Sequence, residues 1–255
     1  MENAKLNKFQ LYINKATAEC QNLSFIEKTQ GLWSEPEIIK YLTRISKDEP
    51  NEFLAASLQE LLPDLNGKKI LCIGGGTGKL GRNILNLYPE LFVTEVDSAP
   101  AMVDCANKLA DQEGFRGRFI SLKADSRLLP FQDGEYNYAI ALGVFRYIDP
   151  INQERSFLEI SRVSNNNFTI AEPILKELIY SLKDKFRNVN YSIKETPISM
   201  FRMSLFYMLF KEYKRNKEFK TIIDSEVDDT NDFIEVLTHV AGMTNGILYE
   251  LRARC

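Results

Sequence analysis

The chain has 255 residues, 44% hydrophobic and 26% charged, a composition that predicts a packed globular protein and excludes a disordered or fibrous chain. Its 32 lysine and arginine residues are balanced by 35 aspartate and glutamate residues, and the net charge of -3 excludes a global basic footprint for nucleic acid. The single histidine, His239, excludes histidine-rich metal sites and is the only histidine available to a catalytic dyad or triad.

Two further absences narrow the class of protein. The four cysteines form no CxxC pair and the first residues show no signal-peptide pattern, so we expect reduced thiols in a cytoplasmic protein. No apolar run approaches the roughly 18 residues of a membrane span, so we expect no stable membrane insertion.

The N-terminal part of the chain shows helical patterns. Apolar residues recur at helical spacing from Leu6 to Cys20 and again from Phe53 to Leu62, and Pro36 favours the first turn of a helix over Glu37–Ile45. We interpret residues 1–66 as an N-terminal helical cap.

Strand and helix patterns then alternate. The predicted strands are Lys68–Ile73, Leu91–Val96, Gly117–Leu122, Tyr138–Leu142 and Phe168–Ala171, and the predicted helices are Leu80–Tyr88, Ala101–Leu109 and Gln153–Val163. This alternation implies parallel strands joined by crossover helices. We therefore expect an α/β fold with a Rossmann-like, doubly wound, mostly parallel sheet.

The last part of the chain is less regular. We expect a helix over Ile174–Phe186, a helix ending at Gly242 and a closing strand over Ile247–Ala253. Aromatic and basic residues interleave from Ile198 to Lys220, which fits a lid over a lipophilic substrate, a membrane-surface helix or an insertion packed on the sheet. We expect a single domain, with a cofactor core over 67–173, a helical insertion over 174–230 and a closing helix and strand over 231–255.

A glycine cluster follows the first predicted strand. The spacing and Leu80 exclude a P-loop, which needs GxxxxGK followed by a hydroxyl residue. Gly74, Gly76 and Gly78 form a GxGxG directly after the strand. A dinucleotide fingerprint is also present at Gly76, Gly78 and Gly81, but its first glycine should follow the strand directly.

Aspartates follow the next two strands. Asp97 stands where a carboxylate can accept both hydroxyls of a ribose; alternatively, it caps the next helix. Asp125 is placed to accept from an exocyclic amine; alternatively, it is a turn residue.

The ordered set CIGGGTG, VDSAP, ADSRLLPFQDGEY, VFRYIDP and FLEISRV, within Lys68–Pro173, resembles the class I S-adenosylmethionine-dependent methyltransferases, in particular their small-molecule group. The resemblance implies a seven-stranded sheet, S-adenosylmethionine as the cofactor, no metal, and methyl transfer to an oxygen, nitrogen or carbon of a small, secondary metabolite. The acceptor, its reacting atom and the oligomeric state stay open.

The resemblance also implies roles for individual residues. The three glycines let backbone approach the methionine part of the cofactor, Asp97 holds the ribose, Met102 packs on the adenine, and Asp125 meets its amine. The implied cofactor-binding residues are Gly74, Gly76, Gly78, Asp97, Ser98, Met102, Ala124, Asp125, Ser126, Leu142 and Gly143, the last two flanking the methyl-transfer channel.

This chain departs from the family pattern at three places. Cys72 stands where the family usually has an acid, Asn137 replaces an aspartate, and residues 164–167 replace a Gly-Gly turn. The first departure removes a contact to the cofactor's ammonium end or leaves it to water. Two alternatives therefore stay open: an NAD(P)-dependent oxidoreductase, and a protein that binds S-adenosylmethionine or S-adenosylhomocysteine without methyl transfer.

Methyl transfer needs alignment and exclusion of water, and it needs a base only when the acceptor loses a proton. Tyr147 and Glu172, which follow the fourth and fifth strands, are the candidate catalytic residues; alternatively, Tyr147 is a packing residue and Glu172 a helix-start acid. A helical projection turns His239 away from the apolar face of its helix, so we expect a surface position. The N-terminal region with Tyr12 and Trp33 is expected to close the other side of the site; alternatively, Trp33 is a buried structural residue.

Overall fold

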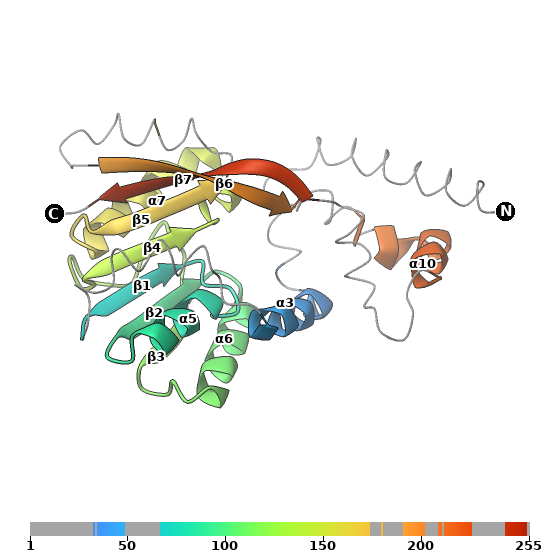
Figure 1. Ribbon diagram of the computed structural model, residues 1–255, viewed down its shortest axis with the longest axis horizontal. Coiled ribbons are helices and arrows are strands. Elements are labelled where there is room, and N and C mark those ends of the chain that lie inside the picture. The colour runs from blue at the N-terminus through green and yellow to red at the C-terminus, as the bar shows by residue number, and fades with distance from the viewer. Residues whose placement is uncertain are drawn as a thin grey trace. The chain divides into compact units, whose positions relative to one another are not determined.

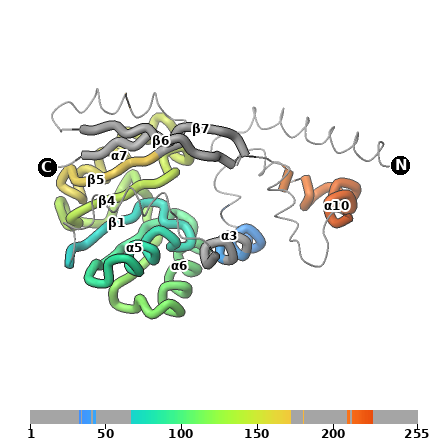
Figure 2. The backbone as a smooth tube through the Cα atoms, in the orientation of Figure 1, coloured from blue at the N-terminus to red at the C-terminus, as the bar shows by residue number. Residues whose placement is uncertain are grey.

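The computed structural model describes part of the chain (Figures 1 and 2). The described residues are 33, 35–48, 67–173, 180, 191–201, 209–210, 212–225 and 243–253. The expected helices over Leu6–Cys20, Phe53–Leu62 and Ile174–Phe186, and the helix ending at Gly242, lie outside these residues, apart from a single helical position at Tyr180. The chain divides into two compact units, Trp33–Thr196 with Ile247–Cys255, and Met1–Leu32 with Pro197–Gly246.

Five parallel strands form the centre of the first unit. They are β1 (Lys69–Ile73), β2 (Phe92–Asp97), β3 (Phe119–Lys123), β4 (Tyr138–Leu142) and β5 (Phe168–Pro173). Their order is β3-β2-β1-β4-β5, and each neighbouring pair is parallel. The five predicted strands are confirmed. The strand order reverses between β1 and β4, which is where open sheets of this kind bind ligands.

Helices cover both faces of the sheet (Figure 1). They are α5 (Lys79–Leu87), α6 (Pro100–Gln112) and α7 (Pro150–Val163), which confirm the three predicted crossover helices. The side chains of β1 alternate between two buried layers: Leu71 packs in the layer of Phe157 on α7, and Cys72 packs in the layer of Ile84 on α5. Burial on both faces explains why the central strands are continuous apolar runs in the sequence.

An N-terminal helix lies against the same unit. α3 (Pro36–Asp48) begins at the proline predicted to favour its first turn. Thr43 Oγ1 lies 3.1 Å from Cys105 Sγ, which joins α3 to α6. Among the described residues, Cys72 and Cys105 are free cysteines.

Two long strands follow β5 in the strand order β3-β2-β1-β4-β5-β7-β6. β7 (Met243–Ala253) pairs antiparallel with β5, with Phe168 opposite Ala253. It contains the predicted closing strand and begins four residues earlier than Ile247. β6 (Tyr191–Phe201) lies within residues 174–230, so the expectation of a helical insertion is wrong for this strand. Pro197 interrupts the strand pattern in the sequence, and the edge position of β6 tolerates a residue that cannot donate a backbone hydrogen bond.

The described residues of the second unit centre on α10 (Lys217–Asp224). Asn216 caps this helix, because its side chain accepts from the backbone of Glu218 and Phe219. Phe210 and Phe219 are buried, so these two members of the aromatic and basic segment are packing residues. Across the described ranges, no helix is long and apolar enough to cross a membrane.

Candidate functional site

The glycine loop begins directly after β1. Gly74, Gly76 and Gly78 have φ values of 64°, 60° and 82°, in the left-handed region that favours glycine. The amide of Gly74 donates to the carbonyl of Val96 (2.7 Å), and a Cβ atom at Gly74 would lie 2.5 Å from Val144 Cγ2. Since β1 ends at Ile73, the GxGxG register fits the strand and the register that starts at Gly76 does not.

Asp97 ends β2 beside this loop. Its Oδ2 atom accepts from the amide of Gly76 (3.0 Å), and its Oδ1 atom accepts from the amide of Ala99 (2.9 Å). The N-cap of α6 is Ala99, so the alternative that Asp97 caps this helix is wrong. Burial raises the pKa of Asp97, and three backbone hydrogen bonds partly oppose this shift. The carboxyl group is therefore held against the glycine loop.

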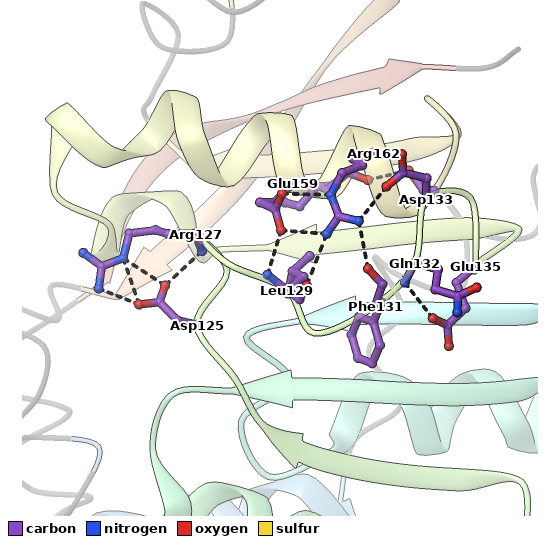
Figure 3. Close-up of polar contacts among 11 residues, drawn as sticks. Asp125, Arg127, Leu129, Phe131, Gln132, Asp133, Glu135, Glu159 and Arg162 are labelled. Carbon is purple, nitrogen blue, oxygen red and sulfur yellow. Dashed lines mark hydrogen bonds and ion pairs between the residues drawn. The ribbon is translucent and has the colours of Figure 1, made fainter.

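The loop after β3 lies next to the end of β2. The amide of Ala124 donates to the carbonyl of Asp97 (3.1 Å). Asp125 forms a tight pair with Arg127, accepting from its amide (2.9 Å), its Nε (2.9 Å) and its Nη2 (2.5 Å) (Figure 3). This pairing lowers the pKa of Asp125. The alternative that Asp125 is a turn residue accounts for these contacts, and an adenine amine would have to share the carboxylate with Arg127.

Three more of the predicted cofactor-binding residues follow β2 or β3 in the chain. Ser98 is exposed beyond the end of β2, and Met102 is buried in the first turn of α6. The hydroxyl oxygen of Ser126 lies 3.0 Å from the hydroxyl oxygen of Ser156 on α7.

The ends of β4 and β5 complete this edge of the sheet. The amide of Gly143, directly after Leu142, donates to the carbonyl of Ala171 (2.8 Å). A Cβ atom at Gly143 would lie 3.6 Å from Nη2 of Arg146, so a guanidinium group stands beside the end of β4. Glu172 pairs with Tyr249 through the β5–β7 ladder, and its side chain lies outside what the structure describes.

Tyr147 lies in a short 3₁₀ helix, Phe145–Tyr147, after β4. Its ring packs edge to face against Trp33 with centroids 5.7 Å apart, and the guanidinium of Arg146 lies 5.8 Å from the same ring. Trp33, from the N-terminal part of the chain, therefore contacts a residue that follows β4, and this contact fits both a closing role and a structural role of the tryptophan. Tyr12 lies outside the described residues.

Sequence reasoning missed Glu95. This residue of β2 is completely buried, and its Oε1 atom accepts from the amide of Gly81 (3.0 Å). Burial raises its pKa to about 8, and burial with the neighbouring Glu95 raises the pKa of Cys72. The available signal was its place two residues before Asp97, which puts both side chains on one face of β2.

A hollow of about 560 Å³ lies at the other edge, near the amino ends of β4 and β5, and is lined partly by Asp133, Arg162 and Asn165. Arg162 binds Glu159, Asp133 and the carbonyl of Phe131, each at 2.8 Å (Figure 3). These contacts fix the loop before β4, and none of the predicted site residues lies there.

The predicted cofactor residues follow the carboxyl ends of β1, β2, β3 and β4. A doubly wound parallel sheet with a GxGxG loop and an adjacent, partly buried aspartate defines a Rossmann-like nucleotide-cofactor domain. Residues 70–167 match the family described as "Methyltransferase domain". This match assigns residues 70–167 to a methyltransferase domain of the class I S-adenosylmethionine-dependent type, and S-adenosylmethionine is the cofactor of this class.

Two curated relatives are named malonyl-[acyl-carrier protein] O-methyltransferase. The one from Geobacter sulfurreducens is 27% identical over 126 residues, which is 49% of this chain and 45% of the relative. The one from Legionella pneumophila is 28% identical over 130 residues, which is 48% of this chain and 44% of the relative. The chain thus matches less than half the length of either relative.

Solved structures share the fold at low sequence identity. Phosphoethanolamine N-methyltransferase 2 from Haemonchus contortus, in complex with S-adenosyl-L-methionine, has a TM-score of 0.59 and 15% identity, covering 91% of this chain and 60% of that chain. The [4+2]-cyclase SpnF has a TM-score of 0.52 and 16% identity, covering 78% and 81%. The structural similarity establishes a common fold, and at these low sequence identities it establishes nothing further.

Proposed function

We propose that this protein is an enzyme that transfers a methyl group from S-adenosylmethionine to an oxygen, nitrogen or carbon atom of a small molecule. The observation that carries the proposal is the hydrogen bond between Asp97 and the glycine loop at the carboxyl edge, inside the stretch that matches the methyltransferase family. The finer architecture is part of the proposal: a seven-stranded sheet and, after β5, an insertion that contains α10 as well as the strand β6.

The residues at this edge fit the cofactor. Among the described residues, apart from the neighbours of Gly76 in the chain, no atom lies within 4 Å of a Cβ position at Gly76, so open space lies next to the residue whose amide binds the Asp97 carboxyl group. In the proposal, Gly74, Gly76 and Gly78 admit the methionine part, and Asp97 binds the ribose hydroxyls. The adenine side is formed by Ser98, Met102, Ala124, Asp125 and Ser126, and the methyl-transfer side by Leu142 and Gly143.

The cofactor supplies a methyl group already activated by its sulfonium, so the protein's task is to align the acceptor and exclude water. In the proposal, the packed rings of Trp33 and Tyr147 help to exclude water from the acceptor. The guanidinium group of Arg146 supplies a positive charge beside Gly143. Tyr147 and Glu172 are the proposed bases for an acceptor that must lose a proton. An acceptor carboxylate is already ionised and needs no base.

The names of the curated relatives make one acceptor class the first to test. Both are named for methyl transfer to malonyl-[acyl-carrier protein], so an acyl carboxylate on a carrier protein belongs in the acceptor panel beside free small molecules. Arg146 has the charge that such a carboxylate would require.

A second candidate is a protein that binds S-adenosylmethionine or S-adenosylhomocysteine without methyl transfer. The observation that favours it is Cys72 at the position of the usual acid, where burial raises the thiol pKa and keeps the group neutral. A protein named a cyclase also has this fold, so the fold by itself does not establish methyl transfer.

Two measurements test the proposal. Calorimetry with S-adenosylhomocysteine should show binding, and labelled methyl transfer from S-adenosylmethionine should show turnover on at least one acceptor of a panel of carboxylates, phenols, amines and malonyl carrier protein. Binding without turnover on the whole panel would favour the second candidate, and absence of binding would exclude both. Glu172→Gln and Tyr147→Phe then identify the base, since only loss of a base changes both turnover and its pH profile.

A further inference from the structure

Glu95 is a buried carboxyl group that the proposed mechanism does not use. It lies within β2 with its side chain completely buried. Its Oε1 atom accepts from the amide of Gly81 at 3.0 Å, and its Oε2 atom has no hydrogen-bond partner among the described residues. Buried polar atoms are normally paired, so this group requires an explanation.

Glu95 contacts both ends of the segment that carries the cofactor loop. A Cβ atom at Gly75 would lie 2.3 Å from its Oε2 atom, and a Cβ atom at Gly81 would lie 2.7 Å from its Oε1 atom. The carboxyl group therefore occupies the space between the start of the loop and the first turn of α5. Its position determines how far the segment from Gly75 to Gly81 lies from β2.

The strand register places Glu95 next to Cys72. The two residues are Cα partners in the parallel ladder of β1 and β2, and paired residues of parallel neighbours point to the same face. Cys72 packs in the layer of Ile84 and Val93, on the side of α5. A carboxyl group is therefore present beside the loop, although position 72 on β1, where the resemblance to the family implies an acid, holds a thiol.

The charges around Glu95 show how it acts. The titratable groups that face it are Cys72 from β1, Arg82 from α5 and Asp97 from its own strand. Arg82 donates from Nε to both carboxylate oxygens of Glu113 at 3.0 Å. Burial raises the pKa of Glu95 to about 8, so the group is mostly neutral at pH 7 and acts through its shape and its hydrogen bond.

We propose that Glu95 is a positioning residue for the cofactor loop, and that it supplies from β2 the carboxyl group that position 72 of β1 lacks. The inference rests on the proposed function, because the loop position matters to an activity only if the loop binds S-adenosylmethionine.

The test compares S-adenosylhomocysteine affinity by calorimetry and thermal unfolding across three variants of the full chain. Glu95→Leu keeps the volume but removes the acceptor, and we expect it to lose about tenfold in affinity. Glu95→Gln keeps shape and acceptor, and we expect affinity within about threefold of wild type. The exchange Cys72→Glu with Glu95→Cys returns the carboxyl group to β1, and we expect it to recover most of the affinity lost in Glu95→Leu.

Glu159→Leu is the matched control. Glu159 also accepts from a backbone amide, that of Leu129 at 2.8 Å, but it lies on α7 away from the glycine loop. We expect this variant to lower thermal stability while leaving affinity unchanged.

Two results would overturn the inference: a Glu95→Leu variant that binds as tightly as wild type, or an exchange variant that folds and binds no better than Glu95→Leu. If Glu95→Leu does not fold, the affinity of the exchange variant for S-adenosylhomocysteine is compared with that of wild type instead. An affinity about tenfold below wild type would then contradict the inference. If wild type itself does not bind S-adenosylhomocysteine, the proposed function fails and this inference fails with it.

Discussion

Asp97 combines two tasks at the residue scale. Its carboxyl group fixes the amide of Gly76 at 3.0 Å, and in the proposed function it also accepts from the ribose hydroxyls. The sequence predicted the second task from strand order alone. The bond to the glycine loop became visible only in the structure.

We expect Asp97→Ala to weaken S-adenosylhomocysteine binding by about 1.5 to 3 kcal/mol, because hydrogen bonds to a carboxylate are lost and the loop is released. Calorimetry measures the difference. Asp133→Ala is the control, since Asp133 is an exposed carboxylate near the opposite edge of the sheet. Unchanged affinity in Asp97→Ala would contradict the ribose assignment.

Glu95 should also give the protein a pH-dependent stability. Its pKa is raised by burial from 4.5 to about 8, so the folded state holds the proton more tightly than the unfolded state. This contribution is fully present below about pH 4.5 and is lost as the pH rises through about 8. We expect the free energy of unfolding of wild type, relative to Glu95→Gln, to fall by a few kcal/mol over that range, on the order set by the shift.

Denaturant unfolding of both proteins from about pH 5 to about pH 9 measures this difference and cancels the titration of the other carboxyl groups. A difference that does not change with pH would show that Glu95 titrates normally.

At the scale of elements, local signals placed the boundaries well. β1 follows its apolar run, and α3 begins at Pro36. α7 begins three residues before the predicted Gln153, at Pro150, with Asp149 as its N-cap. β6 was missed because an edge strand with a proline has neither continuous hydrophobicity nor regular alternation. Central strands therefore leave a clearer sequence pattern than edge strands do.

Asp149, the N-cap of α7 that the sequence analysis did not identify, gives a test at the scale of elements. Its side chain accepts from the amide of Ile151 at 3.1 Å, at the start of α7. We expect Asp149→Ala to lower the free energy of unfolding by about 1 kcal/mol, whereas Asp149→Asn keeps an acceptor and should restore most of that loss. Urea unfolding measures both, and equal stabilities of the two variants would show that the cap contributes nothing.

At the scale of the whole molecule, one histidine limits the chemistry. We expect His239→Ala to retain turnover within about threefold of wild type, because alignment of the acceptor needs no imidazole. Steady-state measurement of kcat and kcat/KM on the acceptor found in the panel provides the test. A hundredfold loss would place His239 in the mechanism.

The sequence by itself determined the order of the five parallel strands and their crossover helices, and the glycine loop with Asp97, because these features depend on short-range periodicity and on the rule that parallel strands end at one edge. The class of cofactor followed from the resemblance of the sequence motifs to a known family. Only the tertiary structure showed that Glu95 lies beside Cys72, that Trp33 packs on Tyr147, and how Asp125 is held. The first two contacts join residues far apart in the chain, and strand register and packing fix them. The third depends on a side-chain conformation, which periodicity does not reveal.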